Sequence, residues 1–164
     1  MKGAAKTNAM RILDRNKIPY KEHLYESDGF MDGVSIAEKL NQPLERVYKT
    51  LVAVGKSKKY YVFVIPVAEE LDLKSAAAAV GEKSVEMIHV KEINAVTGYI
   101  RGGCSPIGMK KQYDTVIDRS AEGFDEIFFS GGRLGAQIEM SPAALADLIC
   151  ARFCDITQKN SERI

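Results

Sequence analysis

The chain has 164 residues, of which 46% are hydrophobic and 27% charged, a composition typical of one compact soluble domain. Its net charge of +1 excludes the bulk basic surface of many nucleic-acid-binding domains, so any such contact must come from a local patch. No apolar run is long enough for a signal peptide or a membrane span. Three cysteines without CxxC spacing argue against a disulfide framework and a zinc site, and we expect a cytosolic protein without metal or cofactor.

The first half of the chain predicts helices followed by a β-hairpin. Thr7 has the chemistry of an N-cap for a first helix, and Ser35 with Glu38 has capping-box spacing for a second. Two runs rich in β-formers flank a polar loop at 55–59, as in a hairpin. The predicted elements are a helix from 8 to about 17, a strand over 20–25, a helix over 35–40, a short helix from 43, and strands over 48–54 and 60–66.

The second half predicts further strands between helices. Asp72 and Gly81 bound an alanine-rich helix. Ser141-Pro142 start a last long helix, whose helical spacing continues to Arg152-Phe153. The predicted elements are helices over 73–80, over 90–97 and from 142, and strands over 85–88, 115–117, 126–129, 136–140 and 155–157.

Strands and helices interleave without a regular βαβ period, and no internal repeat or linker interrupts them. We therefore expect an α+β fold with a mixed β-sheet, curled into a barrel-like shape and surrounded by helices. The domain is expected to cover 1–164, with a core from about 6 to 157. Cys150 and Cys154, spaced i and i+4 on the last predicted helix, are expected to pack in the core.

Two glycine-rich stretches, 98–111 and 129–135, are the most unusual feature of the sequence. Glycines cluster where the backbone needs a positive φ or where a ligand approaches the main chain. Gly102-Gly103, followed by Ser105-Pro106, predicts a loop with free backbone N–H groups. Each stretch also carries an arginine and a serine, so we expect the two loops to face one another across a cleft. For either loop alone, a simple hairpin turn is the favoured interpretation.

Lys49 is the candidate charge for this cleft. On a strand its side chain shares a face with the apolar residues Val47, Leu51 and Ala53. A buried ammonium without a partner is costly, so Lys49 should reach a cleft or an anion, unless it lies at a solvent-facing strand start. A lysine beside backbone N–H donors suits a carbonyl, a carboxylate or a phosphate.

Motifs of the common hydrolases and phosphotransferases are absent. The chain has two histidines, His23 and His89, and neither lies in a recognisable arrangement of nucleophile, base and orienting group. Cys104 is a conceivable thiol nucleophile, but no histidine is near it in the sequence to act as its base.

The order of the motifs resembles that of the YbaK/EbsC family, free-standing relatives of the editing domain inserted in bacterial prolyl-tRNA synthetases. The resemblance covers about residues 6 to 157, and a GGxSPxGxKK motif paired with SGG[KR]xG is its most specific part. The matching segments are Ile18-Pro19, Tyr48-Lys49-Thr50-Leu51, Gly98-Tyr99 with Gly102 to Lys111, Ser130-Gly131-Gly132-Arg133 and Glu139-Met140-Ser141-Pro142.

The resemblance implies which residues form the site. Lys49 is implied to contact the acylated end of the tRNA, Gly102 and Gly103 to flank the scissile ester, and Ser130 to act from the second loop. Gln137 stands where some members carry an aspartate, and the loop length near Phe30 differs from the family pattern. The substrate-binding positions implied by the resemblance are Tyr25, Phe30, Thr50, Cys104, Ser105, Gly131, Gly132, Arg133 and Gln137.

The implied activity is deacylation, in trans, of cysteine mischarged onto proline tRNA. The implied partners are the acceptor end of tRNA(Pro) and prolyl-tRNA synthetase, with no membrane and no DNA. An aminoacyl ester is already activated and mainly needs positioning and an oxyanion site. The resemblance implies that the thiol of the substrate attacks the carbonyl.

Basic residues available for phosphates are Lys56, Lys58, Lys59, Arg101, Lys110, Lys111 and Arg133. The alternatives are a deacylase for another misacylated tRNA, such as Ala-tRNA(Pro), and a non-catalytic module that binds tRNA or nucleotides.

Overall fold

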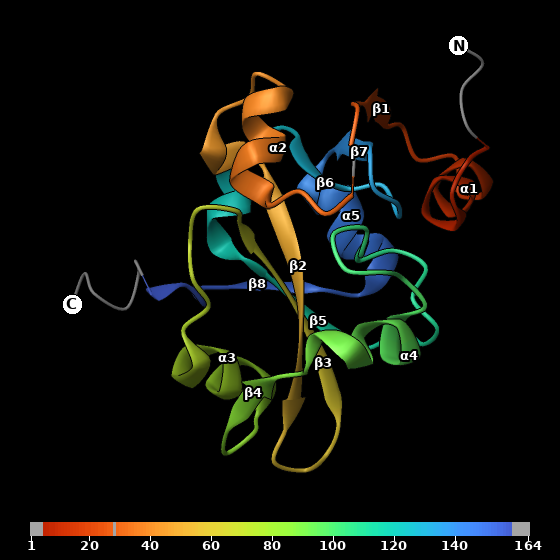
Figure 1. Cartoon of the computed structure of the whole chain (residues 1–164). Coiled ribbons are helices and arrows are strands. Elements are labelled where there is room, and N and C mark those ends of the chain that lie inside the picture. Colours follow the sequence, from red (N-terminus) through yellow and green to blue (C-terminus); the bar gives the residue numbers. More distant parts are fainter. Residues whose placement is uncertain (1–4, 28, 159–164) are drawn as a thin grey trace.

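The computed structural model describes residues 5–27 and 29–158 and shows two β-sheets with helices packed around them (Figure 1). The larger sheet has the strand order β4-β2-β3-β5-β8, and the smaller has the order β1-β7-β6. The β3–β5 and β5–β8 pairs are parallel and the other pairs are antiparallel. The strands are β1 (Lys21–Leu24), β2 (Tyr48–Gly55), β3 (Tyr60–Pro66), β4 (Val85–Met87), β5 (Asp114–Asp118), β6 (Ile127–Ser130), β7 (Ala136–Met140) and β8 (Arg152–Cys154).

Short helices connect these strands, and several begin or end at the residues that the sequence predicts. The Thr7 side chain accepts a hydrogen bond from the Met10 N–H at the start of α1, and Gly81 ends α3 in the left-handed conformation. The helices are α1 (Asn8–Arg15), α2 (Gly33–Lys39), α3 (Leu73–Val80), α4 (Ile93–Thr97) and α5 (Pro142–Ile149), with 3₁₀ turns η1 (Leu44–Arg46), η2 (Val90–Glu92) and η3 (Arg119–Gly123). Within the described ranges, no helix is long and apolar enough to cross a membrane.

The predicted α+β class is confirmed, but the barrel-like closure is not. Among the described residues the two sheets are joined by a single parallel bridge between Val47 and Phe128. A closed barrel needs a continuous hydrogen-bonded ladder around its circumference. β2 pairs with β3 along its length and with β4 only at its end, and the residue before its start makes the single bridge to the small sheet.

Two predicted helix boundaries are wrong. α2 begins at Gly33, because the Asp32 carboxylate accepts the Ser35 N–H at 2.8 Å and takes the capping role assigned to Ser35. α5 ends at Ile149, because Cys150 adopts a left-handed conformation with φ of 56°.

The chain after α5 therefore differs from the prediction. Residues 152–154 form the edge strand β8, which runs parallel to β5, in place of the predicted end of the helix. The predicted strand over 155–157 reduces to one isolated bridge between Leu71 and Thr157. Cys150 and Cys154 do not share a helix. The expected packing in the core is wrong for Cys150, which is exposed, whereas the partly buried Cys154 packs against the core of the large sheet.

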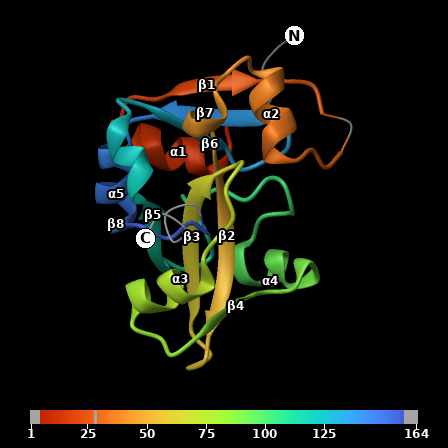
Figure 2. The same ribbon diagram turned by 90° about the vertical axis from the view of Figure 1, so that its left-hand side faces the viewer.

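The small sheet is covered on both faces, as Figure 2 shows. Phe128 and Phe129 are adjacent on β6 and fully buried, and their side chains point to opposite faces. Phe129 packs in the cluster with Met10 of α1 and Leu145 of α5, whereas Phe128 packs in the cluster with Ala37 of α2. The large sheet has its own cluster, in which Phe63 and Ile65 pack with the alanines of α3.

The two glycine-rich loops pack directly against each other. A Cβ added to Gly103 would lie 3.0 Å from the Arg133 Cα and 3.2 Å from the Leu134 nitrogen. A Cβ added to Gly102 would lie 2.9 Å from a Leu134 methyl group and 3.0 Å from the Phe30 ring. The loops are therefore in contact at Gly103, and do not stand across a cleft from one another there.

Replacing Gly103 should loosen this contact. The new Cβ of Gly103→Ala would meet backbone atoms, which cannot rotate away, so we expect the free energy of unfolding to fall by about 1–3 kcal/mol. Denaturant unfolding measures the change. Gly123→Ala is the matched control, because a Cβ there meets no atom within 4 Å. Equal stability of the two variants would contradict the close approach of the loops.

Candidate functional site

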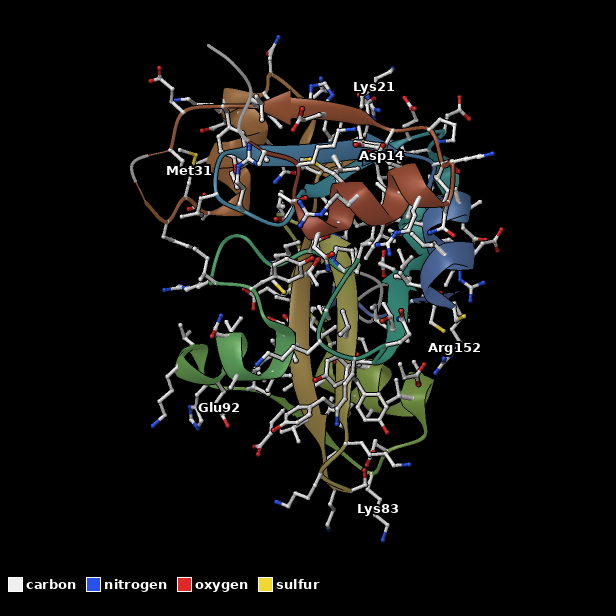
Figure 3. The ribbon with its side chains drawn as sticks, turned by 90° about the vertical axis from the view of Figure 1, so that its right-hand side faces the viewer. Asp14, Lys21, Met31, Lys83, Glu92 and Arg152 are labelled. Atoms are coloured by element: carbon white, nitrogen blue, oxygen red, sulfur yellow. The ribbon has the colours of Figure 1, made fainter. Side chains whose placement is uncertain are left out.

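A cavity of about 580 Å³ lies where the two sheets meet. Residues 47–52 at the start of β2 line it, together with Ser130 of β6 and Gln137 of β7. The loop before α2, the segment between β4 and α4, and residues of the first glycine-rich loop complete its walls. In Figure 3 the labelled residues Met31 and Glu92 mark the first two of these segments.

The structure brings together about half of the site residues that the sequence analysis selected. The cavity is lined by Phe30, Lys49, Thr50, Gly102, Cys104, Ser130 and Gln137. The remaining selected residues lie outside its lining and are Tyr25, Gly103, Ser105, Gly131, Gly132 and Arg133.

Several of the residues outside the lining shape the loops. The Ser105 hydroxyl is buried and accepts the Ile107 N–H at 3.2 Å. The Gly132 N–H donates to the Ser130 hydroxyl oxygen at 3.1 Å, which fixes that hydroxyl at the cavity wall. The Arg133 guanidinium donates to the Ala5 carbonyl and so ties the second loop to the N-terminal segment.

Lys49 is a partly buried cation in the cavity wall. Its ammonium group forms no hydrogen bond or ion pair within the described residues. Burial lowers the pKa of Lys49, while the negative charges of Glu70 and Glu69 act in the opposite direction. The fold thus holds a positive charge at this wall without neutralising it by direct contact, which leaves the ammonium available to an anionic or carbonyl group of a ligand.

Three buried side-chain polar atoms in the described part of the chain have no hydrogen-bond partner, and all three belong to selected site residues. They are the Tyr25 hydroxyl, the Thr50 hydroxyl and the Gln137 side-chain oxygen. Thr50 and Gln137 line the cavity, and Gln137 is only 3% exposed. Buried polar groups are normally paired, and each unpaired one costs about 1–3 kcal/mol. Such groups concentrated at one cavity indicate a site for a polar ligand.

The first glycine-rich loop is less open than its sequence suggests. The Gly103 N–H donates to the Ile100 carbonyl at 2.9 Å, and Gly102 has a φ of 85°. This is the geometry of a type II turn, which requires a positive φ at its third residue. The Gly131 N–H likewise donates to the Ala136 carbonyl. The expectation that these N–H groups are free is therefore wrong for Gly103 and Gly131, whereas the Gly102 N–H has no partner within the described residues.

Tyr99, which the sequence analysis did not select, holds this loop in place. Tyr99 is buried, and its hydroxyl donates a hydrogen bond to the Ile107 carbonyl. The backbone N–H of Tyr99 donates to the Thr97 hydroxyl at 3.0 Å. A Cβ on Gly132 would lie 3.2 Å from the Tyr99 ring. The only signal in the sequence was an aromatic residue directly after Gly98, at the entry to a polar loop.

Cys104 lines the cavity but has the wrong electrostatics for a nucleophile. Burial raises the pKa of its thiol to about 11, with a smaller opposing effect from a hydrogen bond with Thr97. The thiolate is the reactive form, so Cys104 stays a neutral thiol near pH 7.

Within the described residues no cluster of three His, Cys, Asp or Glu side chains could hold a metal ion.

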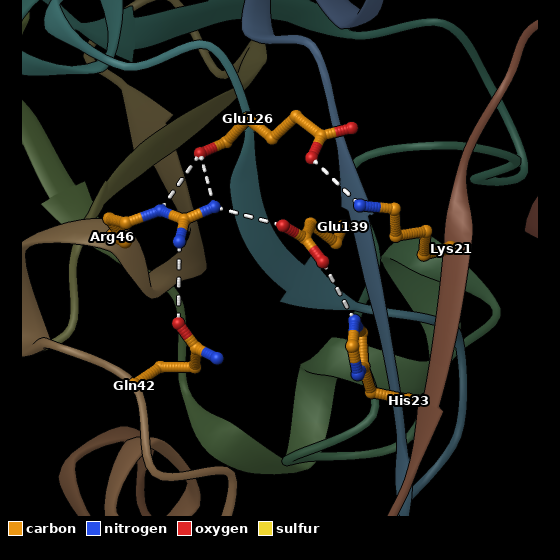
Figure 4. A network of polar contacts seen from close by, with 6 residues as sticks. All are labelled: Lys21, His23, Gln42, Arg46, Glu126 and Glu139. Carbon is orange, nitrogen blue, oxygen red and sulfur yellow. Dashed lines mark hydrogen bonds and ion pairs between the residues drawn. The ribbon is translucent and has the colours of Figure 1, made fainter.

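A second feature that the sequence analysis missed is the polar network shown in Figure 4. The Glu139 carboxylate of β7 accepts hydrogen bonds from Arg46 at 2.9 Å and from a ring nitrogen of His23 at 2.8 Å. Burial acts against ionisation of Glu139, but these two hydrogen bonds hold its pKa below the ordinary value. Arg46 also donates to the Glu126 carbonyl. His23 therefore anchors β1 and β7 and is absent from the lining of the cavity.

The basic residues selected for phosphate contact do not form one patch. Arg101 lines the cavity, and its guanidinium lies 4.2 Å from the centre of the Phe30 ring. Lys56, Lys58 and Lys59 lie at the far tip of the β2–β3 hairpin, at the bottom of Figure 1. The tip is about 17 Å from Thr50, because five residues of strand separate Thr50 from Gly55.

The fold is shared with solved structures of other proteins. A crystal structure of a candidate trans-editing enzyme for prolyl-tRNA synthetase matches with a TM-score of 0.77 and 22% identity, over 93% of this chain and 99% of that one. A crystal structure of a hypothetical protein matches with a TM-score of 0.83 and 22% identity, over 90% of this chain and 97% of that one. This chain therefore has the same α+β fold as these two proteins.

Sequence similarity identifies the family. Residues 31–148 match the model of the aminoacyl-tRNA editing domain, and the chain belongs to this family. It is also 48% identical, over 94% of both chains, to EbsC of Enterococcus faecalis, which is named as a candidate Cys-tRNA(Pro)/Cys-tRNA(Cys) deacylase.

The lowered pKa of Lys49 makes a prediction about stability. The folded state binds the Lys49 proton more weakly than the unfolded chain does, so Lys49 destabilises the fold at neutral pH. This cost disappears as the pH rises through the lowered pKa toward 10.5. We therefore expect Lys49→Met to raise the free energy of unfolding at pH 7, with a smaller gain at higher pH. Urea denaturation at several pH values measures both.

The exposed lysine Lys74 on α3 provides the control. Lys74→Met removes a charge without relieving burial, so its effect on stability should be small and should not follow the same pH trend. A loss of stability in Lys49→Met at pH 7 would contradict the assignment of Lys49 as an uncompensated cation.

Proposed function

We propose that this protein is a trans-editing deacylase that hydrolyses the ester of cysteine mischarged onto proline tRNA, with Cys-tRNA(Cys) as a second substrate. We further propose that residues 1–164 act as a single editing domain with its core at about 6–157. Membership of the aminoacyl-tRNA editing family and the name of the Enterococcus faecalis relative support this substrate class.

The observation that carries the proposal is the combination of Lys49 with unpaired buried polar atoms in one cavity. Thr50 and Gln137 each present a polar atom without a partner, and Lys49 presents an unpaired cation. An aminoacyl ester at the end of a tRNA brings a carbonyl oxygen, ribose hydroxyls and an ammonium group, and such a ligand can pair with all of them.

In the proposed reaction the protein polarises and positions the ester. The Lys49 ammonium stabilises the negative charge that develops on the carbonyl oxygen, and the Gly102 N–H is the backbone donor beside it. The Ser130 hydroxyl oxygen already accepts the Gly132 N–H, so its own proton is directed away from that bond and is available to the substrate.

The nucleophile in this proposal is the thiol of the substrate. Its sulfur forms a bond to the carbonyl carbon, the ester C–O bond breaks, and the thiol proton ends on the ribose hydroxyl of the released tRNA. The thiolactone product is then hydrolysed by water. Tethering the thiol to the carbonyl raises its effective concentration, although ring strain makes the gain far smaller than the ~10⁵–10⁸ M of the best cases.

The proposed partner in the cell is prolyl-tRNA synthetase, which would present the mischarged tRNA. The scattered basic residues and the net charge of +1 favour recognition of the acceptor end over recognition of a whole tRNA surface. Deacylation of Cys-tRNA(Pro), Ala-tRNA(Pro) and Cys-tRNA(Cys), each with and without the synthetase, tests substrate and partner together. Preferred hydrolysis of Ala-tRNA(Pro), or binding without hydrolysis, would contradict the proposal.

Lys49→Ala should abolish most of this activity. Loss of one donor to a developing oxyanion typically lowers kcat about 10²–10³-fold, and we expect a loss in this range. Single-turnover deacylation of Cys-tRNA(Pro) measures it, with Lys74→Ala as the surface control. Near wild-type turnover by Lys49→Ala, in a folded protein, would show that the reactive ester lies elsewhere.

Cys104→Ala should stay active within about threefold, because a thiol with a pKa of about 11 cannot be the nucleophile near neutral pH. Replacing the cysteine of the substrate by serine or alanine should instead slow deacylation sharply. The two rates are compared under the same single-turnover conditions. An acyl-enzyme trapped on Cys104, or an inactive but folded Cys104→Ala, would overturn the substrate-thiol mechanism.

A further inference from the structure

The large hydrophobic side chains that the described residues expose gather around the cavity. Met87 and Val90 line it and are 42% and 54% exposed, and Phe30 lines it at 53% exposed. Ile100, at 54% exposed, directly precedes the lining residue Arg101. The remaining members of this exposed set are Leu73, which lines a smaller cavity that shares Met87 with the main one, and Leu24, which lines neither.

These residues form a rim on three segments of the chain. We call Phe30, Met87, Val90 and Ile100 the apolar rim. Single exposed hydrophobic residues are normal on protein surfaces, whereas a group of them at the mouth of a cavity marks a binding surface. The rim belongs to the loop before α2, the end of β4 with the start of η2, and the first glycine-rich loop.

Two cations without an ion pair to any described residue lie at the rim, next to carboxylates that cap the nearby helices. The Arg101 guanidinium lies over the Phe30 ring, and Lys91 follows Val90 at an exposed position. Within the described residues neither cation forms an ion pair. The Asp32 carboxylate accepts the Ser35 N–H and the Glu92 carboxylate accepts the His89 N–H, so these two negative charges are held at helix starts and leave the two cations free for phosphates.

We propose that the apolar rim stacks the unpaired nucleobases that precede the terminal nucleotide of an RNA 3′ end. This inference rests on the proposed function, in which the terminal nucleoside and its aminoacyl group enter the cavity. Single-stranded bases bind to proteins chiefly by stacking on aromatic, apolar and guanidinium surfaces, with cations nearby for the phosphates. The rim supplies both kinds of group at the mouth of the cavity.

A nucleic acid fits this surface better than a protein partner does. The apolar rim is continuous with the cavity, whose wall carries the Lys49 ammonium and unpaired polar atoms. A single ligand that contacts both must therefore have apolar surfaces for the rim and polar or charged groups for the cavity. Nucleotides have this character, because their bases are flat and apolar on both faces and their backbone is anionic.

The test compares two RNA hairpins that carry a four-nucleotide 3′ overhang, one with normal bases and one with abasic nucleotides in the overhang. The phosphates are the same in both, so only stacking differs. We expect the wild-type protein to bind the normal overhang at least about tenfold more tightly. The double variant Met87→Ser/Val90→Asn should lose most of this preference. Leu24→Ser is the matched control, because Leu24 is 48% exposed and lies outside the cavity lining, and it should keep the preference.

Deacylation of Cys-tRNA(Pro), measured in parallel, separates this inference from the proposed function. Discrimination between the hairpins without any deacylation would support the rim and contradict the deacylase. Deacylation at a wild-type rate by the double variant, or equal affinity of the wild type for both hairpins, would overturn the rim. Loss of synthetase binding in the double variant, with base discrimination intact, would assign the rim to a protein partner and overturn it as well.

Discussion

The close approach of two backbone segments at Gly103 is the constraint on which the site depends. A Cβ at Gly103 would lie only 3.0 Å from the Arg133 Cα, closer than side chains normally approach, so the two glycine-rich loops pack as one wall. Tyr99 fixes the same wall from inside through its hydrogen bond to the Ile107 carbonyl and its contact with Gly132. Gly102 and Cys104 on one loop and Ser130 on the other therefore reach the cavity from a single rigid surface.

The part of the cavity wall that β2 forms carries an electrostatic cost. Lys49 reaches the cavity from β2, where burial disfavours its charge and the acids Glu69 and Glu70 only partly offset that burial. Direct pairing of Lys49 with a carboxylate would stabilise the fold, but it would also occupy the group that a ligand needs. The Thr50 hydroxyl on the same strand, and the Gln137 side-chain oxygen beside Ser130, are likewise buried without a partner among the described residues. These unpaired polar groups lower the stability of the fold around the cavity and remain available to a ligand.

Local signals in the sequence predicted most of the elements, and long-range contacts account for the misses. Caps at Thr7 and Gly81 and the β2–β3 hairpin are encoded by neighbouring residues. The end of α5 is not encoded by neighbouring residues, because cysteine has no intrinsic preference for the left-handed conformation that Cys150 adopts. The strand β8 likewise depends on its parallel pairing with β5, which is distant in the sequence. Lys49 and Gly102 could also be selected from the sequence, because the motifs that contain them consist of neighbouring residues. Tyr99, the network around Glu139 and the apolar rim join residues from distant segments, and no spacing in the sequence reveals them.

Among the described residues, the cavity lining offers neither a reactive thiol nor a histidine base. A thiol whose pKa is raised to about 11 by burial is inert near neutral pH, and His23 is occupied by Glu139 away from the cavity lining. The cavity therefore offers charge, hydrogen bonds and shape, but no strong nucleophile of its own. A correct aminoacyl ester without a thiol would be polarised there and yet be attacked only by water. In the mechanism proposed above, selectivity therefore comes from the reactivity of the bound amino acid and does not require a tight fit of its side chain in the cavity of about 580 Å³.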